Sequence, residues 1–185
     1  MAKISKKLFT VDDYHRMVAA GILREDDRVE LIRGEVLQMS PIGPPHNGTI
    51  LRASHGMWEI VKNRALVGVQ GSIRLDMYSE PQPDLYLLRP VADFYTSRLA
   101  GPPDIFLIIE VADSSLEYDQ DAMLLLYAQT GIPEYWISDI AGERVIAYSD
   151  LEAGVYRTVR EFRRGEVLAP QLLPDCRIPI EILLP

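Results

Sequence analysis

The chain has 185 residues, a length typical of one domain rather than two. With 48% hydrophobic and 25% charged residues its composition is that of a folded globular protein, and no apolar run approaches the ~20 residues of a membrane span. A net charge of -8 argues against a protein that coats nucleic acid non-specifically, but not against an acidic site that holds a cation.

The cellular compartment is suggested by the single cysteine and by the start of the chain. Cys176 cannot form an internal disulfide, which fits a reducing cytoplasm, and we expect it to be a small buried apolar group. The first ten residues are basic, but no apolar stretch follows them, so we expect no signal peptide. The sequence therefore predicts a cytoplasmic protein that does not enter a membrane.

The N-terminal third predicts two helices and a hairpin. Residues 1–9 are expected to be a tail, and residues 10–185 a single domain. Thr10 and Asp13 have the spacing of a helix N-cap and its third residue, which predicts a helix that ends near Gly21. Two short apolar stretches around Arg33-Gly34 then predict a β-hairpin, and near-helical apolar spacing over 46–63 predicts a second helix.

The remainder is dominated by strand patterns. Strands are predicted over residues 65–70, 72–77, 83–88, 104–113, 132–139, 143–149, 155–162 and 176–185. The continuous apolar run of 104–113 is typical of a buried central strand. The last segment, 176–185, is typical of an edge strand, where Pro179 is tolerated. A loop or a broken helix is expected over 91–103, and a helix over 119–130. The predicted fold class is α/β (α+β-like), with one mixed sheet and few helices.

Three acids lie against these apolar strands. Asp84 begins one strand, Glu110 ends the apolar run of another, and Glu30 lies in the first strand of the hairpin. Burying a carboxylate is costly unless it is paired or binds a metal, and Mg²⁺ is typically held by one or two carboxylates with water and phosphate. The alternative from spacing alone is that Asp84 caps a turn and Glu110 pairs with an arginine.

The order of several motifs around these acids resembles a large bacterial family of predicted restriction endonucleases in the PD-(D/E)XK nuclease superfamily. The matching segments are RVELIRGE, SPIGPPHN, QPDLYLL, IIEVADSS, EYD and YAQTGIPEYWISD. The likeness runs from about Phe9 to about Asp139. It implies a restriction-endonuclease-like mixed central sheet flanked by helices, with extra antiparallel strands.

The resemblance also implies roles for single residues. Asp84 and Glu110 would ligate Mg²⁺, or Mn²⁺ in its place, and Glu30 would be an accessory acid of the same catalytic site. His46 would lie beside the site as a contact to a ligand or to phosphate; the alternative is an ordinary residue near a helix N-terminus.

One position departs from the family pattern. The superfamily uses a lysine to position water and to stabilise charge, and the resembling family carries it on the helix that follows the second acid. Here that position is Met123, and methionine can neither carry charge nor donate a proton. No lysine follows Lys62, so Lys62 and Arg74 remain as candidates for a compensating cation.

Three functions stay open on these grounds. The first is an Mg²⁺-dependent endonuclease that hydrolyses phosphodiester bonds in DNA. The second is a catalytically impaired relative that binds nucleic acid or a protein partner, and the third is a small-molecule phosphodiesterase or a simple metal-binding protein. We expect a homodimer, because two-fold symmetry matches that of duplex DNA, and the apolar C-terminal segment could form its interface.

Overall fold

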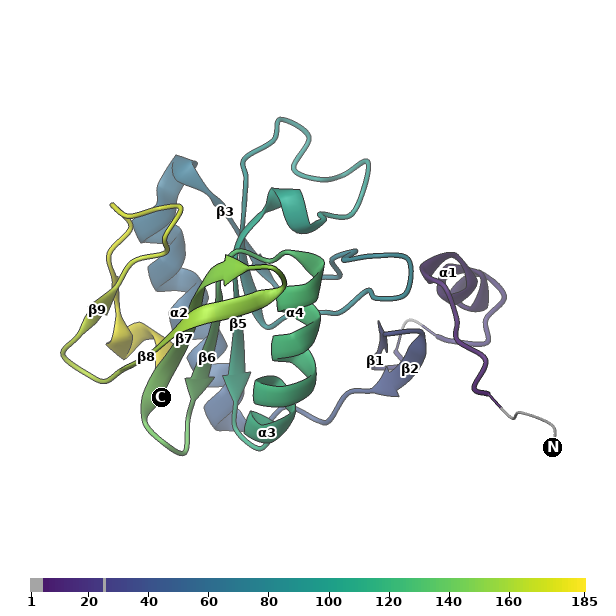
Figure 1. Cartoon of the computed structure of the whole chain (residues 1–185), viewed down its shortest axis with the longest axis horizontal. Helices are drawn as coiled ribbons and strands as arrows, with labels where there is room; N and C mark the ends of the chain where they lie inside the picture. Colours follow the sequence, from purple (N-terminus) through teal and green to yellow (C-terminus); the bar gives the residue numbers. More distant parts are fainter. Residues whose placement is uncertain (1–4, 25) are drawn as a thin grey trace.

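The computed structural model describes residues 5–24 and 26–185, and its centre is a six-stranded sheet in the order β3-β4-β5-β6-β7-β8 (Figure 1). β5 and β6 run parallel, and the other neighbouring pairs are antiparallel. The strands are β3 (Leu66–Val69), β4 (Leu85–Leu88), β5 (Ile105–Ala112), β6 (Tyr135–Asp139), β7 (Arg144–Glu152) and β8 (Val155–Phe162). The predicted mixed sheet and α/β class are confirmed.

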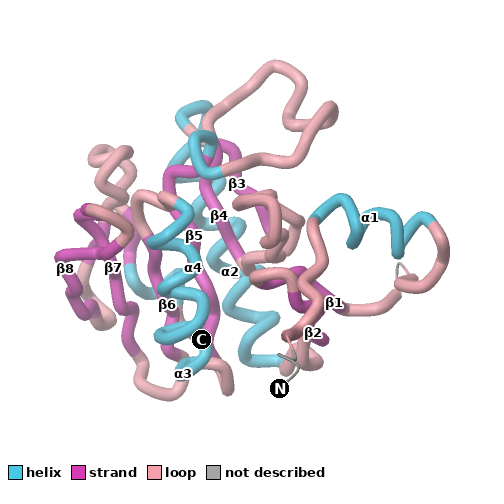
Figure 2. The backbone as a smooth tube through the Cα atoms, turned by 45° about the vertical axis from the view of Figure 1, so that its right-hand side comes forward, coloured by secondary structure: helices cyan, strands magenta, loops and turns pink. Residues whose placement is uncertain are grey.

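Helices cover both faces of this sheet (Figure 2). Alternate residues of β5 point to opposite faces, so Leu107 and Ile109 pack on the α2 side and Ile108 on the α4 side. All eight residues of β5 are buried, as a central strand covered on both sides requires. The helical elements are α2 (Pro44–Val61), α3 (Leu116–Tyr118), the π-helical segment η3 (Asp119–Met123), α4 (Leu124–Thr130) and the 3-10 turns η1 (Lys62–Arg64), η2 (Pro102–Asp104) and η4 (Ile180–Leu183).

The N-terminal elements form a small unit beside the sheet (Figure 1). They are α1 (Val11–Ala19) and the hairpin strands β1 (Val29–Ile32) and β2 (Glu35–Gln38). Thr10 and Asp13 form the predicted capping box, and Arg33 and Gly34 form the predicted turn with φ of 50° and 80°. The first helix and the hairpin are therefore confirmed.

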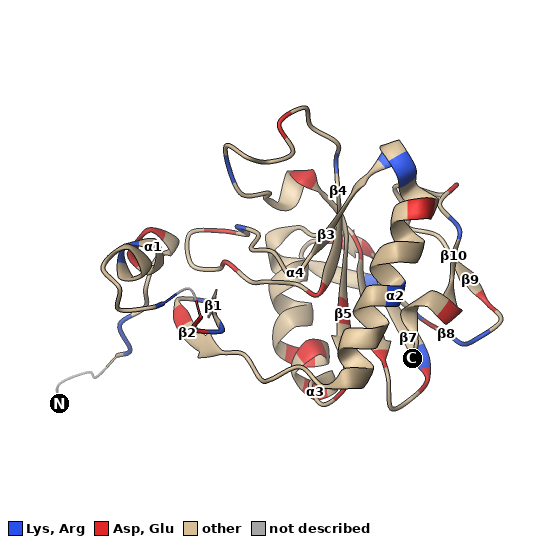
Figure 3. Cartoon of the chain, turned by 180° about the vertical axis from the view of Figure 1, so that it is seen from behind, with Lys and Arg blue, Asp and Glu red and all other residues tan. Residues whose placement is uncertain are grey.

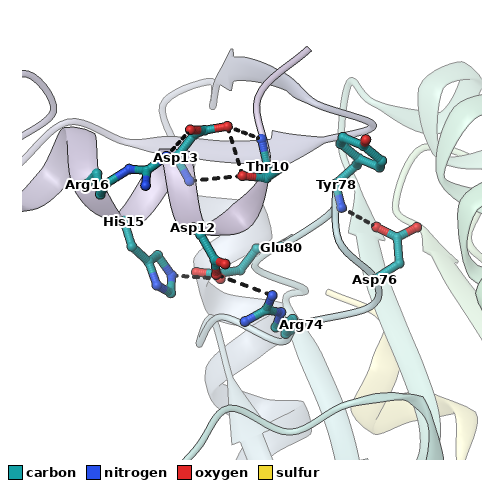
Figure 4. Close-up of polar contacts among 9 residues, drawn as sticks. All are labelled: Thr10, Asp12, Asp13, His15, Arg16, Arg74, Asp76, Tyr78 and Glu80. Atoms are coloured by element: carbon teal, nitrogen blue, oxygen red, sulfur yellow. Dashed lines mark hydrogen bonds and ion pairs between the residues drawn. The ribbon is translucent and has the colours of Figure 1, made fainter.

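Polar contacts fix α1 against the loop between β3 and β4 (Figure 4). His15 Nε2 lies 2.8 Å from Oε2 of Glu80, a buried acid, and Arg74 pairs with Asp12 at 3.4 Å. The backbone of Glu80 also bridges to Leu31 of the hairpin. The loop therefore ties the N-terminal unit to the sheet, and through it β1 is held near the start of β4.

Two predicted strands are wrong. Residues 72–77 form an irregular loop: Ile73 and Leu75 are buried, but their N–H groups bond to Pro81 and Ser79 rather than to a strand. Of residues 176–185, β10 (Ile178–Pro179) alone pairs, with β9 (Val167–Leu168). η4 then packs against α2, where Gly56 makes room for Ile182.

The prediction that an apolar C-terminal strand forms a dimer interface is also wrong, because that segment is not exposed. Ile180, Leu183 and Leu184 are fully buried in the core beside α2, so they offer no exposed apolar strand to a partner. Cys176 is buried in the same core, as expected. Among the described residues no helix is both long and apolar enough to cross a membrane.

Candidate functional site

Asp84 and Glu110 meet where β4 begins and β5 nears its end. The antiparallel register pairs Leu85 with Ile109, so Asp84 lies opposite Glu110. Each carboxylate accepts a hydrogen bond from the backbone beside the other: Asp84 N donates to Glu110 Oε2 at 3.1 Å, and Val111 N donates to Asp84 Oδ2 at 2.9 Å. The two carboxylates are therefore fixed next to each other, and the alternatives of a turn cap and an arginine pair do not describe them.

Glu110 is the more buried of the two acids. The hydroxyl of Tyr127, on α4, donates to Glu110 Oε1 at 2.7 Å, in a region where both side chains are buried. Burial, reinforced by the charges of Asp84 and Asp119, raises the pKa of Glu110 well above its usual value. A charged Glu110 is therefore costly in this position unless a cation lies close to it.

Glu30 reaches the same place from the hairpin. Its Oε2 accepts a hydrogen bond from Gln82 N at 3.3 Å, two residues before Asp84. Burial raises the pKa of Glu30, with further contributions from Asp119 and Asp84. The structure thus brings together the three acids singled out in the sequence, although they come from three separate segments.

These side chains line a cavity of about 540 Å³ at this end of the sheet. Asp119, at the start of η3, adds a fourth acid, and its Oδ2 accepts a hydrogen bond from Ser115 Oγ at 2.6 Å. Burial raises the pKa of Asp119 to about 6, and Asp84 contributes to this shift. Together with Asp113, which also lines the cavity, these four acids concentrate negative charge that would attract a cation.

His46 contacts Asp84 directly. It lies in the first turn of α2, and its Nε2 is 3.0 Å from Asp84 Oδ2. Burial alone would lower the pKa of His46, but the hydrogen bond and the charge of Asp84 outweigh burial and raise it. Its other ring nitrogen, Nδ1, is buried and has no hydrogen-bond partner among the described residues. The structure places His46 at the expected position beside the site.

Met123 lies at the wall of the cavity, at the position where the resemblance implies a lysine. Its side chain is 3% exposed and packs in the core on the α4 side of the sheet. Neither proposed compensating cation is near: Lys62 lies at the far end of α2, and Arg74 pairs with Asp12 of α1. Among the described lining residues, the basic ones are Arg28 and His46.

Several residues of the site were not assigned to it from the sequence. Gln70, directly after β3, donates to Asp84 Oδ1 at 3.2 Å. Tyr127 and Asp119 were also not among the residues that the sequence assigned to the site. Asp119, Met123 and Tyr127 are spaced by four, which puts them on one helix face, and this periodicity could have linked them. No pattern marked Gln70, because its contact depends on how β3 pairs with β4.

The donor set fits a hard divalent cation. Its members are carboxylate oxygens, which Mg²⁺ and Mn²⁺ prefer. Within residues 5–24 and 26–185, no three His, Cys, Asp or Glu side chains are arranged to hold a metal by themselves. A cation here would take two carboxylates and complete its coordination with water and substrate oxygens, which is the usual manner of Mg²⁺.

The fold of this chain resembles that of a solved structure. A solved structure described as a "putative nuclease belonging to DUF820 from Anabaena variabilis ATCC 29413" superposes with a TM-score of 0.73 over 95% of this chain and 97% of that one. The sequences are 14% identical, so this likeness shows the fold alone. No curated protein matches the chain.

The sequence itself matches a family model over residues 11–181, a range that includes all four acids and His46. The model is that of Uma2, described as "Putative restriction endonuclease". The match confirms the resemblance seen in the motifs, and the fold of the solved relative agrees with it. The chain therefore belongs to the Uma2 family of restriction-endonuclease-like proteins.

Proposed function

We propose that this protein is a metal-dependent endonuclease that hydrolyses phosphodiester bonds in DNA. The observation that carries the proposal is the reciprocal pair of backbone hydrogen bonds between the Asp84 and Glu110 segments, which fixes two carboxylates beside each other. The family description and the fold of the solved relative support nuclease chemistry in general.

Each residue has a distinct part in this proposal. Asp84 and Glu110 hold Mg²⁺ or Mn²⁺, and Glu30 is an accessory acid that can accept a proton from the attacking water or bind that water. His46 orients Asp84 through its Nε2, while Tyr127 and Gln70 orient the two ligands from the other sides. When bound, the cation supplies Lewis-acid stabilisation of charge on the phosphate and lowers the pKa of its water.

The second candidate is a catalytically impaired relative that keeps the site for binding. Met123 favours this candidate, because a buried methionine occupies the position of a cation that would stabilise developing charge. Removing one such electrostatic group commonly lowers the rate by roughly 10²–10³-fold. We therefore expect slow turnover by the wild-type protein.

The test is nicking of supercoiled plasmid and of single-stranded circular DNA with Mg²⁺ or Mn²⁺. Nicking by the wild type that Asp84→Asn abolishes supports the proposal, with Asp150→Asn on the surface of β7 as the matched control. No nicking by the wild type, together with nicking by Met123→Lys, supports the impaired relative. No nicking by either protein, and no metal binding, contradicts both.

Met123→Lys is the most informative single change. The aliphatic part of lysine can follow the path of the methionine, and its ammonium group would face the carboxylates of the cavity. We expect nicking to rise by about 10²-fold. Met123→Leu, which conserves volume but adds no charge, should leave the rate unchanged.

We also propose that the protein acts as a homodimer, since two sites are needed to cut both strands of a duplex in one encounter. Light scattering under the conditions of the nicking assay measures the molecular mass of the protein and so distinguishes a monomer from a dimer. A monomer that nicks but does not linearise the plasmid would contradict the dimer without affecting the proposed chemistry.

A further inference from the structure

A second cavity, of about 710 Å³, runs beside the edge strand β3 and is not used by the proposed chemistry. It is lined by residues 66–68 of β3, by Gly71 and Ser72, by the C-terminal end of α2 and by residues of the loop over 90–100. That loop projects beyond the sheet at the end away from α3 (Figure 1). We refer to this cavity as the β3 groove.

Exposed aromatic rings line the β3 groove. Trp58 is 67% exposed and Phe94 is 71% exposed, which makes them the two most exposed aromatic residues described. Tyr86 also lines the groove, and it lies across β3: a Cβ at Gly68 would be 2.0 Å from its ring, and one at Gly71 would be 2.5 Å from its hydroxyl. The glycines thus let one aromatic ring lie flat on the edge strand.

The loop holds Phe94 outward in a backbone conformation that is energetically unfavourable. Phe94 and Tyr95 have φ of 51° and 60°, a left-handed conformation that is unfavourable for bulky aromatic residues. The hydroxyl of Tyr95 bonds to Arg89 O at 2.8 Å, and the Arg98 guanidinium lies 5.1 Å from the centre of its ring. Tyr95 therefore anchors the loop, while the ring of Phe94 stays in water.

The charge of the β3 groove is opposite to that of the whole molecule. Its charged lining residues, among those described, are Lys62 and Arg98, whereas the chain carries a net charge of -8. Arg98 is already paired with Asp104 at 2.6 Å, so Lys62 is the cation available to a ligand. Figure 3 shows basic residues in blue at this end of α2, with an acidic segment of the same helix beside them. An anionic ligand with flat apolar parts complements such a surface.

The β3 groove also adjoins the candidate site. Consecutive residues line the two cavities: Gln70, which contacts Asp84, lines the site, and Gly71 lines the groove. The four residues of β3 span roughly 13 Å, a length that corresponds to a few nucleotides. A chain that enters along β3 would therefore be led toward the four acids.

We propose that the β3 groove binds a single strand of DNA, with bases stacked on Trp58 and Phe94 and a phosphate on Lys62. This inference rests on the proposed function for its choice of DNA as the ligand. Unpaired bases present the flat faces that the rings need, whereas a duplex hides them between base pairs. The groove would thus select single-stranded segments, or duplexes that open at the site.

The test measures binding without cleavage. Fluorescence anisotropy with a labelled oligothymidylate of about 12 nucleotides, and with the same length of duplex, is recorded in EDTA at low salt. We expect tighter binding of the single strand, and a loss of about tenfold for each of Trp58→Ala and Phe94→Ala. Phe94→Tyr should retain affinity, and Lys62→Glu should lower the affinity and its salt dependence. Ile22→Ala and Arg157→Glu are the matched controls, because both residues are exposed, Ile22 in the N-terminal unit and Arg157 on β8 at the opposite edge of the sheet.

Each outcome decides the inference separately from the proposed function. Equal affinity for single strand and duplex, or no effect of Trp58→Ala and Phe94→Ala, overturns it even if the protein nicks DNA. If Trp58→Ala changes the molecular mass of the protein in solution, the groove binds a second copy of the chain, and the proposed binding of single-stranded DNA is overturned. Ring-dependent binding by a protein that never nicks sustains the inference and contradicts the proposed function.

Discussion

Tyr127 shows how a core residue can serve the site. Its hydroxyl bonds to Glu110 at 2.7 Å, and this bond favours the charged carboxylate, against the burial that disfavours it. Residues that orient a metal ligand commonly change metal affinity by 10–100-fold when they are replaced, so the hydroxyl is expected to matter beyond its contribution to stability.

Tyr127→Phe should therefore weaken Mn²⁺ binding roughly tenfold and lower the free energy of unfolding by about 1 kcal/mol. Calorimetric titration with Mn²⁺ and urea unfolding measure the two effects. Tyr156→Phe is the matched control, because its buried hydroxyl bonds to Ile132 O at 2.8 Å, far from the acids. It should reduce stability similarly and leave metal affinity unchanged; equal loss of affinity in both variants would contradict the role of Tyr127.

Glu134 is a buried acid outside the site. It accepts hydrogen bonds from Trp136 Nε1 at 2.8 Å and from Gln171 N at 2.6 Å. Burial raises the pKa of Glu134 from 4.5 to about 7, and these two bonds offset only part of the shift. The unfolded chain therefore binds fewer protons than the folded chain between these two pH values.

The free energy of unfolding should consequently fall as the pH rises from about 4.5 to about 7, by up to roughly 1.4 kcal/mol per pH unit from this group. Stability from the protonated form is fully present below pH 4.5 and is lost through pH 7. Urea unfolding across this range should show a shallower slope in Glu134→Gln. The pKa values of Glu30, Glu110 and Asp119 are also raised, so these groups lower the free energy of unfolding over the same pH range. The test therefore compares the slope of the wild type with the slope of the variant. Parallel slopes would rule out a titrating Glu134.

Among the elements, β3 contains a glycine whose lack of a side chain is required by its packing. Gly68 is opposite Tyr86, whose ring occupies the space of a Cβ. Neither residue can give way easily, since Gly68 belongs to the sheet and Tyr86 is 8% exposed. The close approach explains why a glycine stands in the middle of a strand, where it is otherwise unfavourable.

Gly68→Ala should lower the free energy of unfolding by about 2 kcal/mol or more, because the new methyl group forces the ring of Tyr86 to move. Gly48→Ala is the opposite case. Gly48 lies in α2, and a methyl group added there would meet no atom within 4 Å, so the change should stabilise by roughly 0.5–1 kcal/mol through helix propensity. Urea unfolding of both variants tests the contrast, and a neutral Gly68→Ala would show that the ring is free to move.

For the molecule as a whole, the acidic cavity is expected to link the binding of the proposed cation to stability. Glu30, Asp84, Glu110 and Asp119 repel one another in the folded state, and the unfolded chain separates them. A cation that binds the folded state alone adds about 2.7 kcal/mol to the free energy of unfolding at a concentration 100 times its Kd. The thermal midpoint should therefore rise with Mg²⁺ or Mn²⁺ concentration.

Asp84→Asn should remove most of this rise, and Asp150→Asn should keep it. Differential scanning calorimetry with increasing Mn²⁺ measures both. A midpoint that rises equally in the two variants would place the metal elsewhere on this acidic chain and would contradict Asp84 as a ligand.

The sequence by itself determined the elements whose signals are local. The capping box at Thr10, the turn at Gly34 and the apolar run of β5 each depend on neighbours in the chain, and each is confirmed. The motif order identified the family, and it pointed to Glu30, His46, Asp84 and Glu110, which the structure brings together around one cavity.

What only the tertiary structure decided depends on partners distant in the chain. Residues 72–77 alternate like a strand, but the N–H groups of Ile73, Arg74 and Leu75 bond to loop residues. Ile180, Leu183 and Leu184 have spacing that also fits a helical turn, and packing on α2 selected it. Strand register brings Gln70 into the site, and no local pattern marks it. Helix packing brings Tyr127 to Glu110, and its only local signal is the four-residue spacing that it shares with Asp119 and Met123.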